Sequence, residues 1–357
     1  MYKINIPKIF DTHAHFREGD MMAGVIPCLA PYLRYAVAMG NLKEPILGEF
    51  KVKKYYAEIK KIALFHGYEE FEPIITVMLT YGMTPKILEE SFYAGARILK
   101  LIPGGSSTNS DQGVALWDLP KFYPVLEKVQ KLGMIFSVHC ELPVKPGKAE
   151  KIPLLHQEEE GIPYIDKVIK AYPRLKIVFE HISSLELCQY FLELDSLNIG
   201  ATLTGHHAFI NYDQVIHSGS DEKVKNTWLY CKPIAKFSDD IREIKKLIIS
   251  GHPRVFYGSD FAPHPPENKI NGAAGIANIP EVAISMLWEL FINNLMQEEA
   301  LERFVKFTSK NALSFYNMPE YKNSLVLAQE KWIVPEKLEN DVHIFKGGDT
   351  LNWKIKI

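Results

Sequence analysis

Short runs of apolar residues recur along the chain, separated by longer and more polar stretches. Most of these runs are continuous rather than alternating in hydrophobicity, which is typical of strands that are covered on both faces. The pattern therefore predicts buried strands over residues 8–15, 34–41, 73–80, 96–103, 134–140, 175–182, 199–206 and 254–260.

The stretches between the predicted strands carry apolar residues at steps of three and four, as amphipathic helices do. In one of them, 83–94, we expect Thr84 to cap the helix amino terminus. Ser183 and Glu186 have the spacing of a capping box ahead of a helix over 186–193. Alternation of strand and helix predicts a parallel sheet, and eight such pairs predict a closed α/β barrel of the TIM-like (β/α)8 type.

The carboxyl-terminal part of the chain has a different pattern. Residues 297–316 have helical spacing, whereas 324–357 contains short β-prone pieces. There is no low-complexity linker between these parts and the barrel. We interpret 1–357 as a single barrel domain, with 320–357 as a carboxyl-terminal extension that packs on the barrel.

Composition narrows the class of protein. The chain has 357 residues, of which 47% are hydrophobic and 24% charged, and a formal net charge of -2. This balance provides no long-range attraction to nucleic acid or to an anionic membrane. The amino terminus lacks a signal-peptide pattern, and no segment approaches the roughly 18 apolar residues of a membrane span. We expect a cytoplasmic protein. Its four cysteines, which form no CxxC pair, argue against a disulfide framework or a zinc ribbon: Cys28, Cys140, Cys188 and Cys231.

Two histidines lie at the end of the first predicted strand. Residues two apart in a strand face the same side, so His13 and His15 point together into the barrel mouth and can share a metal ion. A lone histidine at a strand end is usually structural, but two in this register, followed by Arg17, favour a metal site.

A lysine interrupts the apolar strand over 96–103. Lys100 is costly to bury as a cation, so one interpretation is that its ammonium extends to the rim of the barrel. The alternative is a lysine with a lowered pKa that reacts with a carbonyl or with carbon dioxide. The carbamate formed with carbon dioxide is an anion with two oxygens, and it could bridge two metal ions.

Imidazole and carboxylate groups also end other predicted strands. They are His139, His181 and Asp260. Active sites of barrels lie at the carboxyl-terminal ends of the strands, and nitrogen and oxygen ligands suit zinc without excluding manganese, cobalt or iron. In this interpretation His13 and His15 hold one metal, and His139 and His181 hold the other. Asp260 ligates the first metal and transfers the proton between the attacking water and the leaving nitrogen.

Local motifs over about residues 8–320 carry a family resemblance. They are DTHAHFREGDMM at 11–22, MGNL at 39–42, KLIPGGSSTNSDQGV at 100–114, SVHCE at 137–141, VFEHI at 178–182, LYCKPI at 229–234 and GSDFAPH at 258–264. With these motifs the chain resembles the amidohydrolase superfamily and, within it, the class II dihydroorotases of the shorter bacterial type.

The resemblance implies an activity and a set of roles. The activity is the zinc-dependent, reversible conversion of (S)-dihydroorotate to N-carbamoyl-L-aspartate, by a homodimer, in pyrimidine synthesis. The implied ligands of two zinc ions, bridged by a carboxylated lysine, are His13, His15, Lys100, His139, His181 and Asp260. The implied substrate contacts are the side chains of Arg17, Asn41 and His264, the backbone at Lys232 and Ala274, and the lid hydroxyls of Ser107 and Thr108.

The chain departs from the family pattern at a few positions. Ser107 stands where threonine is expected, Lys232 where an apolar residue is common, and Cys140 where glycine is common. The loop over 104–113 could be an ordinary βα connection rather than a lid. His206 and His207 are interpreted as residues at the rim of the pocket or next to the metal ligands. Rival functions are another cyclic amidase, such as a hydantoinase or allantoinase, and a non-catalytic barrel homologue.

Overall fold

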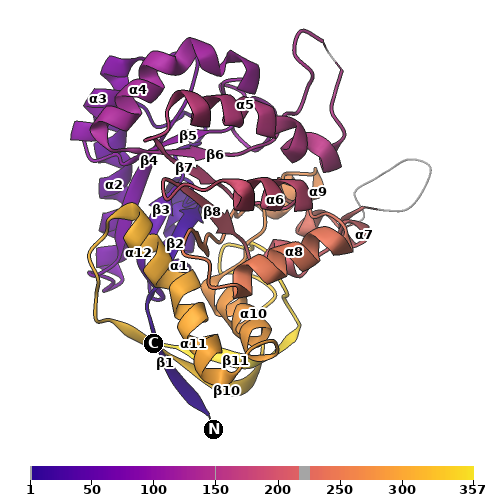
Figure 1. Ribbon diagram of the computed structural model, residues 1–357. Helices are drawn as coiled ribbons and strands as arrows, with labels where there is room; N and C mark the ends of the chain where they lie inside the picture. Colours follow the sequence, from indigo (N-terminus) through magenta and orange to yellow (C-terminus); the bar gives the residue numbers. More distant parts are fainter. Residues whose placement is uncertain (1, 149, 217–225) are drawn as a thin grey trace.

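The computed structural model describes residues 2–148, 150–216 and 226–357 (Figure 1). Its main sheet has eight parallel strands that follow one another in chain order. They are β2 (Ile9–Ala14), β3 (Leu33–Ala38), β4 (Glu72–Met78), β5 (Ile98–Leu101), β6 (Ile135–Val138), β7 (Lys176–Phe179), β8 (Ile199–Leu203) and β9 (Val255–Tyr257). The predicted (β/α)8 barrel is therefore confirmed.

The ring closes between β2 and the segment that follows β9. Ala14 forms a parallel bridge with Phe261, and the backbone N–H of His15 donates to the carbonyl oxygen of Phe261 at 2.9 Å. The hydroxyl of Thr12 donates to the carbonyl oxygen of Tyr257 at 2.7 Å. Several strands end earlier than predicted because the last residues of each apolar run leave the ladder and become the loops at the barrel mouth.

Helices surround the barrel between successive strands (Figure 1). They are α1 (Gly19–Leu29), α2 (Gly48–Phe65), α3 (Pro85–Tyr93), α4 (Tyr123–Leu132), α5 (Gln157–Ala171), α6 (Leu185–Glu193), α7 (Tyr212–Val215) and α8 (Ser238–Ile249). Short 3-10 turns lie at Leu116–Phe122, Leu154–His156, His206–Ala208 and Thr227–Leu229. None of the helices in the described part of the chain has both the length and the apolar character that a transmembrane helix needs.

The two predicted helix caps had different outcomes. Thr84 does cap α3, because its hydroxyl accepts from the backbone N–H of Ile87. The prediction for α6 was wrong by one residue: Ser184 accepts from the backbone N–H of Leu187. Ser183 is instead held by a buried ion pair between Glu158 and Lys236, which no local spacing could indicate.

The carboxyl-terminal part of the chain forms helices and then a separate small sheet. After β9 come α9 (Pro266–Ile270), α10 (Pro280–Ile292), α11 (Gln297–Val305), a π-helical turn (Lys306–Lys310) and α12 (Asn311–Tyr316). The predicted helical stretch 297–316 is thus confirmed. The β-prone tail forms β10 (Ser324–Ile333) and β11 (Thr350–Lys356), which pair antiparallel in the order β1 (Lys3–Pro7), β10, β11. Trp353 of β11 packs edge-on against Trp288 of α10, with ring centroids 5.7 Å apart.

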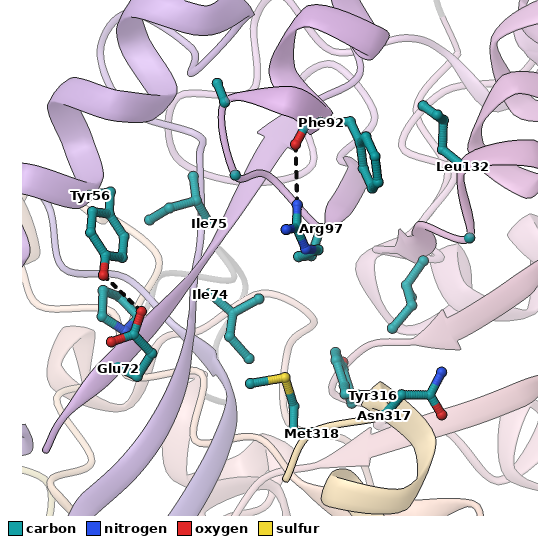
Figure 2. A pocket seen from close by; sticks show the side chains of 15 residues that line it. Tyr56, Glu72, Ile74, Ile75, Phe92, Arg97, Leu132, Tyr316, Asn317 and Met318 are labelled. Atoms are coloured by element: carbon teal, nitrogen blue, oxygen red, sulfur yellow. Dashed lines mark hydrogen bonds between the residues drawn. The ribbon is translucent and has the colours of Figure 1, made fainter.

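The amino-terminal end of the barrel is filled by apolar side chains. Phe315 of α12 packs on Phe256 of β9, and the neighbouring Tyr316 packs on Phe10 of β2, each with ring centroids 5.3 Å apart. Beside α12, a cavity of about 550 Å³ opens at the starts of β4, β5 and β6 (Figure 2). Arg97 in this cavity donates to the carbonyl oxygen of Phe92 at 3.1 Å. The cavity contains none of the predicted site residues and lies at the end of the barrel that usually serves stability rather than chemistry.

A buried ion pair joins three elements outside the barrel mouth. Lys236, just before α8, lies 2.7 Å from Glu158 of α5, with both side chains at most 3% exposed. Ser183, which follows β7, donates its hydroxyl to the same carboxylate at 2.5 Å. Removal of one partner from such a pair leaves a buried charge without compensation.

We predict that Lys236→Met lowers the free energy of unfolding by about 3–5 kcal/mol. The matched control is Lys170→Met, which removes an exposed pair with Asp166 and should cost less than about 1 kcal/mol. Denaturant-induced unfolding at equal metal content measures both values. The double substitution Lys236→Met with Glu158→Gln should recover part of the loss. Equal small losses in the two single variants would contradict the prediction.

Candidate metal centre and active site

The six predicted ligands meet at the carboxyl-terminal end of the barrel. They lie within or just beyond the ends of five different strands, and each side chain is buried. The residues that follow the strands are held in unusual conformations: His181 has φ 40° and Asp260 has φ 44°. A positive φ is strained for residues other than glycine, and such strain persists where the surrounding structure over-determines the backbone. The fold therefore holds both side chains in place at an energetic cost.

His13, His15 and Asp260 form one compact group of donors. Oδ1 of Asp260 lies 3.4 Å from Nε2 of His13 and 3.3 Å from Nε2 of His15. One donor atom from each of the three side chains lies within 4.8 Å of the others, as a shared metal ion requires. Burial lowers the pKa of His15 to about 3, so this imidazole is in the neutral form that binds metals.

The carboxylate of Asp260 is ionised at neutral pH. Burial raises its pKa, but its interactions with His15 and His13 outweigh this effect and leave the pKa well below its usual value. An ionised carboxylate at this position can bind a cation and can accept a proton.

His139 and His181 form a second group beside the first. Nδ1 of His139 lies 3.1 Å from Nε2 of His181, and Nε2 of His139 lies 2.6 Å from Oε2 of Glu141. If His139 donates its Nε2 proton to Glu141, its Nδ1 lone pair faces His181. Nδ1 of His181 has no hydrogen-bond partner among the described residues, and burial lowers the pKa of His181 well below its usual value. Two imidazoles whose ring nitrogens face one another in a buried site fit a metal ion.

Lys100 is fully enclosed between these groups. Its Nζ has no hydrogen-bond partner in the described ranges, and it lies 4.0 Å from the carboxylate oxygen Oε1 of Glu180. The interpretation that Lys100 extends to the rim is therefore wrong, because its side chain is only 1% exposed. Burial lowers the pKa of Lys100 to about 8, which increases the share of free amine that can react with carbon dioxide. An unpartnered buried amine beside histidines and a carboxylate fits a modified, metal-bridging lysine.

Two carboxylates that were not predicted as site residues orient the histidines. Oε2 of Glu180 lies 2.7 Å from Nδ1 of His13 and also accepts from the hydroxyl of Thr202 at 2.9 Å. A proton on Nδ1 leaves Nε2 of His13 free to bind a metal. Glu141 has the same relation to His139. The signal for both was present in the motifs, because each carboxylate lies within two residues of a strand-end histidine.

A polar cavity borders the metal-ligand group. It is lined by His15, Arg17, Asn41, Ser107, Thr108, Lys232, Asp260, Ala262, Ala274 and Gly275. Nε2 of His264 lies 3.0 Å from both Nη2 of Arg17 and the carbonyl oxygen of Ala274. Burial lowers the pKa of Arg17 to about 10, so its guanidinium stays charged at neutral pH, and lowers the pKa of His264 to about 3. The structure thus brings every predicted substrate contact to one place, where the buried guanidinium of Arg17 can hold a carboxylate.

The loop that follows β5 covers this cavity. The side-chain amide of Asn41 donates to the carbonyl oxygen of Thr108 at 3.1 Å, and the hydroxyl of Thr108 donates to the carbonyl oxygen of Ala274 at 3.3 Å. Inside the loop, Ser110 accepts from the backbone N–H of Ser107 at 3.1 Å. The space left for the centres of water molecules is only about 10 Å³. In this conformation the loop leaves little room beside Asp260, and its role as a lid stays a prediction.

Lys232 lines the cavity and also contacts two polar side chains with its ammonium group. Its Nζ donates to Oε1 of Gln157 at 3.1 Å and lies 3.7 Å from Oε1 of Glu141. Burial raises the pKa of Glu141, but Lys232 and His139 outweigh burial and lower it. The lysine that departs from the family pattern therefore has a counter-ion within the site.

His206 and His207 are buried rather than exposed at the rim. His207 lies 2.8 Å from the hydroxyl of Thr204 and 2.9 Å from the carbonyl oxygen of Pro233. With Cys231 the two histidines could geometrically surround a cation. Because both ring nitrogens of His207 already have partners, we interpret this histidine as a structural residue rather than a metal ligand.

Comparison with known proteins identifies relatives over the full length. No family model matches the chain. The dihydroorotase of Buchnera aphidicola subsp. Acyrthosiphon pisum (strain Tuc7) is 32% identical over 361 residues, covering 99% of this chain and 98% of the relative. The dihydroorotase of Campylobacter jejuni has 31% identity and a TM-score of 0.86, covering 99% of this chain and 98% of that one.

Other solved structures extend the comparison. A dihydroorotase from Saccharomyces cerevisiae, in complex with 5-fluoroorotic acid, has a TM-score of 0.88 and 29% identity and covers 100% of this chain and 99% of that one. The L-hydantoinase of Arthrobacter aurescens has a TM-score of 0.76 at 14% identity, over 99% of this chain and 83% of that one, and so shares the barrel fold. Because the chain is 32% identical to a curated dihydroorotase over nearly its full length, it belongs to the dihydroorotase family of metal-dependent amidohydrolases.

Proposed function

We propose that the protein interconverts (S)-dihydroorotate and N-carbamoyl-L-aspartate, in the direction of ring closure during pyrimidine synthesis. The observation that carries this proposal is the buried Arg17 guanidinium in the same cavity as His15 and Asp260. A site of this kind fits a small cyclic amide that carries one carboxylate on its ring. The yeast relative, which was solved with 5-fluoroorotic acid, supports the same substrate class because that ligand is a pyrimidine ring with a carboxylate.

The donor set supports two zinc ions per chain as the proposed cofactor. His13, His15 and Asp260 would hold one ion, His139 and His181 the other, and a carboxylated Lys100 would bridge them. When bound, these ions would activate water and polarise the scissile carbonyl. The isolated Nζ of Lys100 and the unpartnered Nδ1 of His181 within the described chain support this assignment.

The protein side chains have separate proposed tasks. The ionised Asp260 accepts the proton of the attacking water and delivers it to the leaving ring nitrogen. Arg17, Asn41 and His264 hold the substrate carboxylate. The backbone at Lys232 and Ala274 binds the ring amides, and the loop with Ser107 and Thr108 closes over the substrate and excludes water. In the family context we also propose a cytoplasmic homodimer in which 1–357 is one domain and 320–357 its packed extension.

The rival functions have weaker support. A hydantoinase shares the barrel, but a hydantoin without a carboxylate would leave the Arg17 charge buried and unpaired. A non-catalytic homologue would have no need of six buried metal-ligand side chains that converge at one end of the barrel.

The direct test is turnover by the zinc-loaded protein. We expect dihydroorotate and N-carbamoyl-aspartate to be interconverted, and a hydantoin to be a poor competitor, as followed by the absorbance of the substrates. Removal of metal with a chelator should abolish turnover and zinc should restore it. A metal-loaded, folded protein that turns over neither compound, or that prefers the hydantoin, would contradict the proposal.

Substitution of Arg17, which is proposed to bind the substrate carboxylate, should lower kcat/KM selectively. Arg17→Met should lower kcat/KM for dihydroorotate by about 100-fold, because a buried charge-assisted contact is worth roughly 2–3 kcal/mol. The matched control is Arg97→Met, which changes a residue of the cavity in Figure 2 and should change kcat/KM less than about twofold. Steady-state kinetics measures both variants. Similar values in the two variants would show that Arg17 does not hold the carboxylate.

The state of Lys100 can be measured without turnover. Native mass spectrometry should show the added mass of one carbon dioxide, which is lost in acid. Metal analysis of the wild-type protein should give about two equivalents per chain, and Lys100→Met should give about one or fewer. Full metal content in Lys100→Met, or an unmodified Lys100 in the metal-loaded protein, would contradict a bridging role.

A further inference from the structure

A buried lysine outside the metal centre makes contacts that the proposed mechanism does not use. Lys269 lies in α9 and is 4% exposed. Its Nζ donates to the carbonyl oxygen of Tyr230 at 2.8 Å, of Ala273 at 3.0 Å and of Gly275 at 2.6 Å. An ammonium group has three donors, and all three are used on backbone oxygens.

The three carbonyl groups belong to the two backbone segments that are proposed to bind the substrate ring. Ala273 and Gly275 lie on either side of Ala274, and Tyr230 precedes Lys232 by two residues. The segments also contact each other directly, because the backbone N–H of Gly275 donates to the carbonyl oxygen of Tyr230 at 2.9 Å. Lys269 therefore lies at the junction of two loops that are far apart in the sequence.

The charge of Lys269 is stabilised by these carbonyl groups. No ion pair of Lys269 is present in the described ranges 2–148, 150–216 and 226–357. Burial lowers its pKa to about 8, so the ammonium form still predominates at pH 7 and keeps its three hydrogen bonds. A buried cation needs such compensation, and its loss would release three backbone oxygens at once.

We propose that Lys269 is a positioning residue, which joins the Tyr230 and Ala273–Gly275 segments so that the backbone between them can bind the ring amides of the substrate. The inference rests on the proposed function. It also explains how the carbonyl oxygen of Ala274 stays within reach of both His264 and Thr108, at 3.0 Å and 3.3 Å. A loosened segment would weaken substrate binding and closure of the loop together, while the metal ligands stay in place.

The experiment compares Lys269→Met, Lys269→Gln and the wild-type protein. Lys269→Met removes the charge and all donors, and we expect KM for dihydroorotate to rise about tenfold or more, with kcat changed less than about threefold. Lys269→Gln keeps two N–H donors and should give an intermediate KM. The dissociation constant for 5-fluoroorotate, from calorimetry, should follow KM in the same order, and metal content should equal that of the wild type.

A matched control separates positioning from general stability. Lys236→Met also removes a buried lysine, but its partners lie outside the two segments, so it should lower Tm without raising KM more than about twofold. If Lys269→Met does not fold, Lys269→Gln and Lys236→Met can be compared at similar Tm. That comparison also separates positioning from general stability.

The outcomes distinguish this inference from the proposed function. A folded Lys269 variant with the KM and 5-fluoroorotate affinity of the wild type would overturn the positioning role and leave the activity intact. An equal rise of KM in Lys236→Met would overturn it as well, because the effect would then follow stability. Absence of turnover in the wild-type protein itself would instead contradict the proposed function.

Discussion

The closure of the barrel between its first and last strands is the constraint on which the site depends. The carboxylate oxygen Oδ1 of Asp11 accepts from the backbone N–H of His13 at 3.0 Å and of Ser259 at 2.8 Å. The carboxylate of Asp11 thus holds both Ser259, which precedes Asp260, and His13, which faces Asp260. Because these contacts are buried, a small shift at this seam would move donors from both strands away from their shared position.

Burial determines the chemistry of the groups that the closure brings together. It keeps the imidazoles of His15 and His181 neutral and lowers the pKa of Lys100 to about 8, whereas Asp260 stays ionised because histidines lie beside it. Each of these states is the one that a metal centre requires: neutral nitrogen, reactive amine and anionic oxygen. The carboxylates of Glu180 and Glu141 then select which nitrogen of His13 and His139 faces the centre.

The substrate side of the pocket is built mainly from loops and backbone. Arg17, which has φ 62°, contributes the cation directly after the histidine pair, so ligand and substrate recognition share one short segment. The loop after β5 and the segment around Ala274 meet over the cavity, and Lys269 anchors the latter from behind. The barrel positions these loops, and the L-hydantoinase of Arthrobacter aurescens shares this barrel fold.

The strands and the six candidate ligands followed from local pattern, because a buried parallel strand is continuously apolar and its last polar residues face the barrel mouth. The family resemblance, rather than spacing, indicated Arg17, Asn41 and His264. Tertiary structure alone decided which serine caps α6, where the amine of Lys100 lies, and which carboxylate Lys232 faces. Lys269 shows the reason most clearly: it contacts Tyr230, 39 residues away, and only folding brings that carbonyl group to it. Local sequence determines the chemistry that each residue offers, whereas burial and long-range partners determine its protonation state, orientation and use.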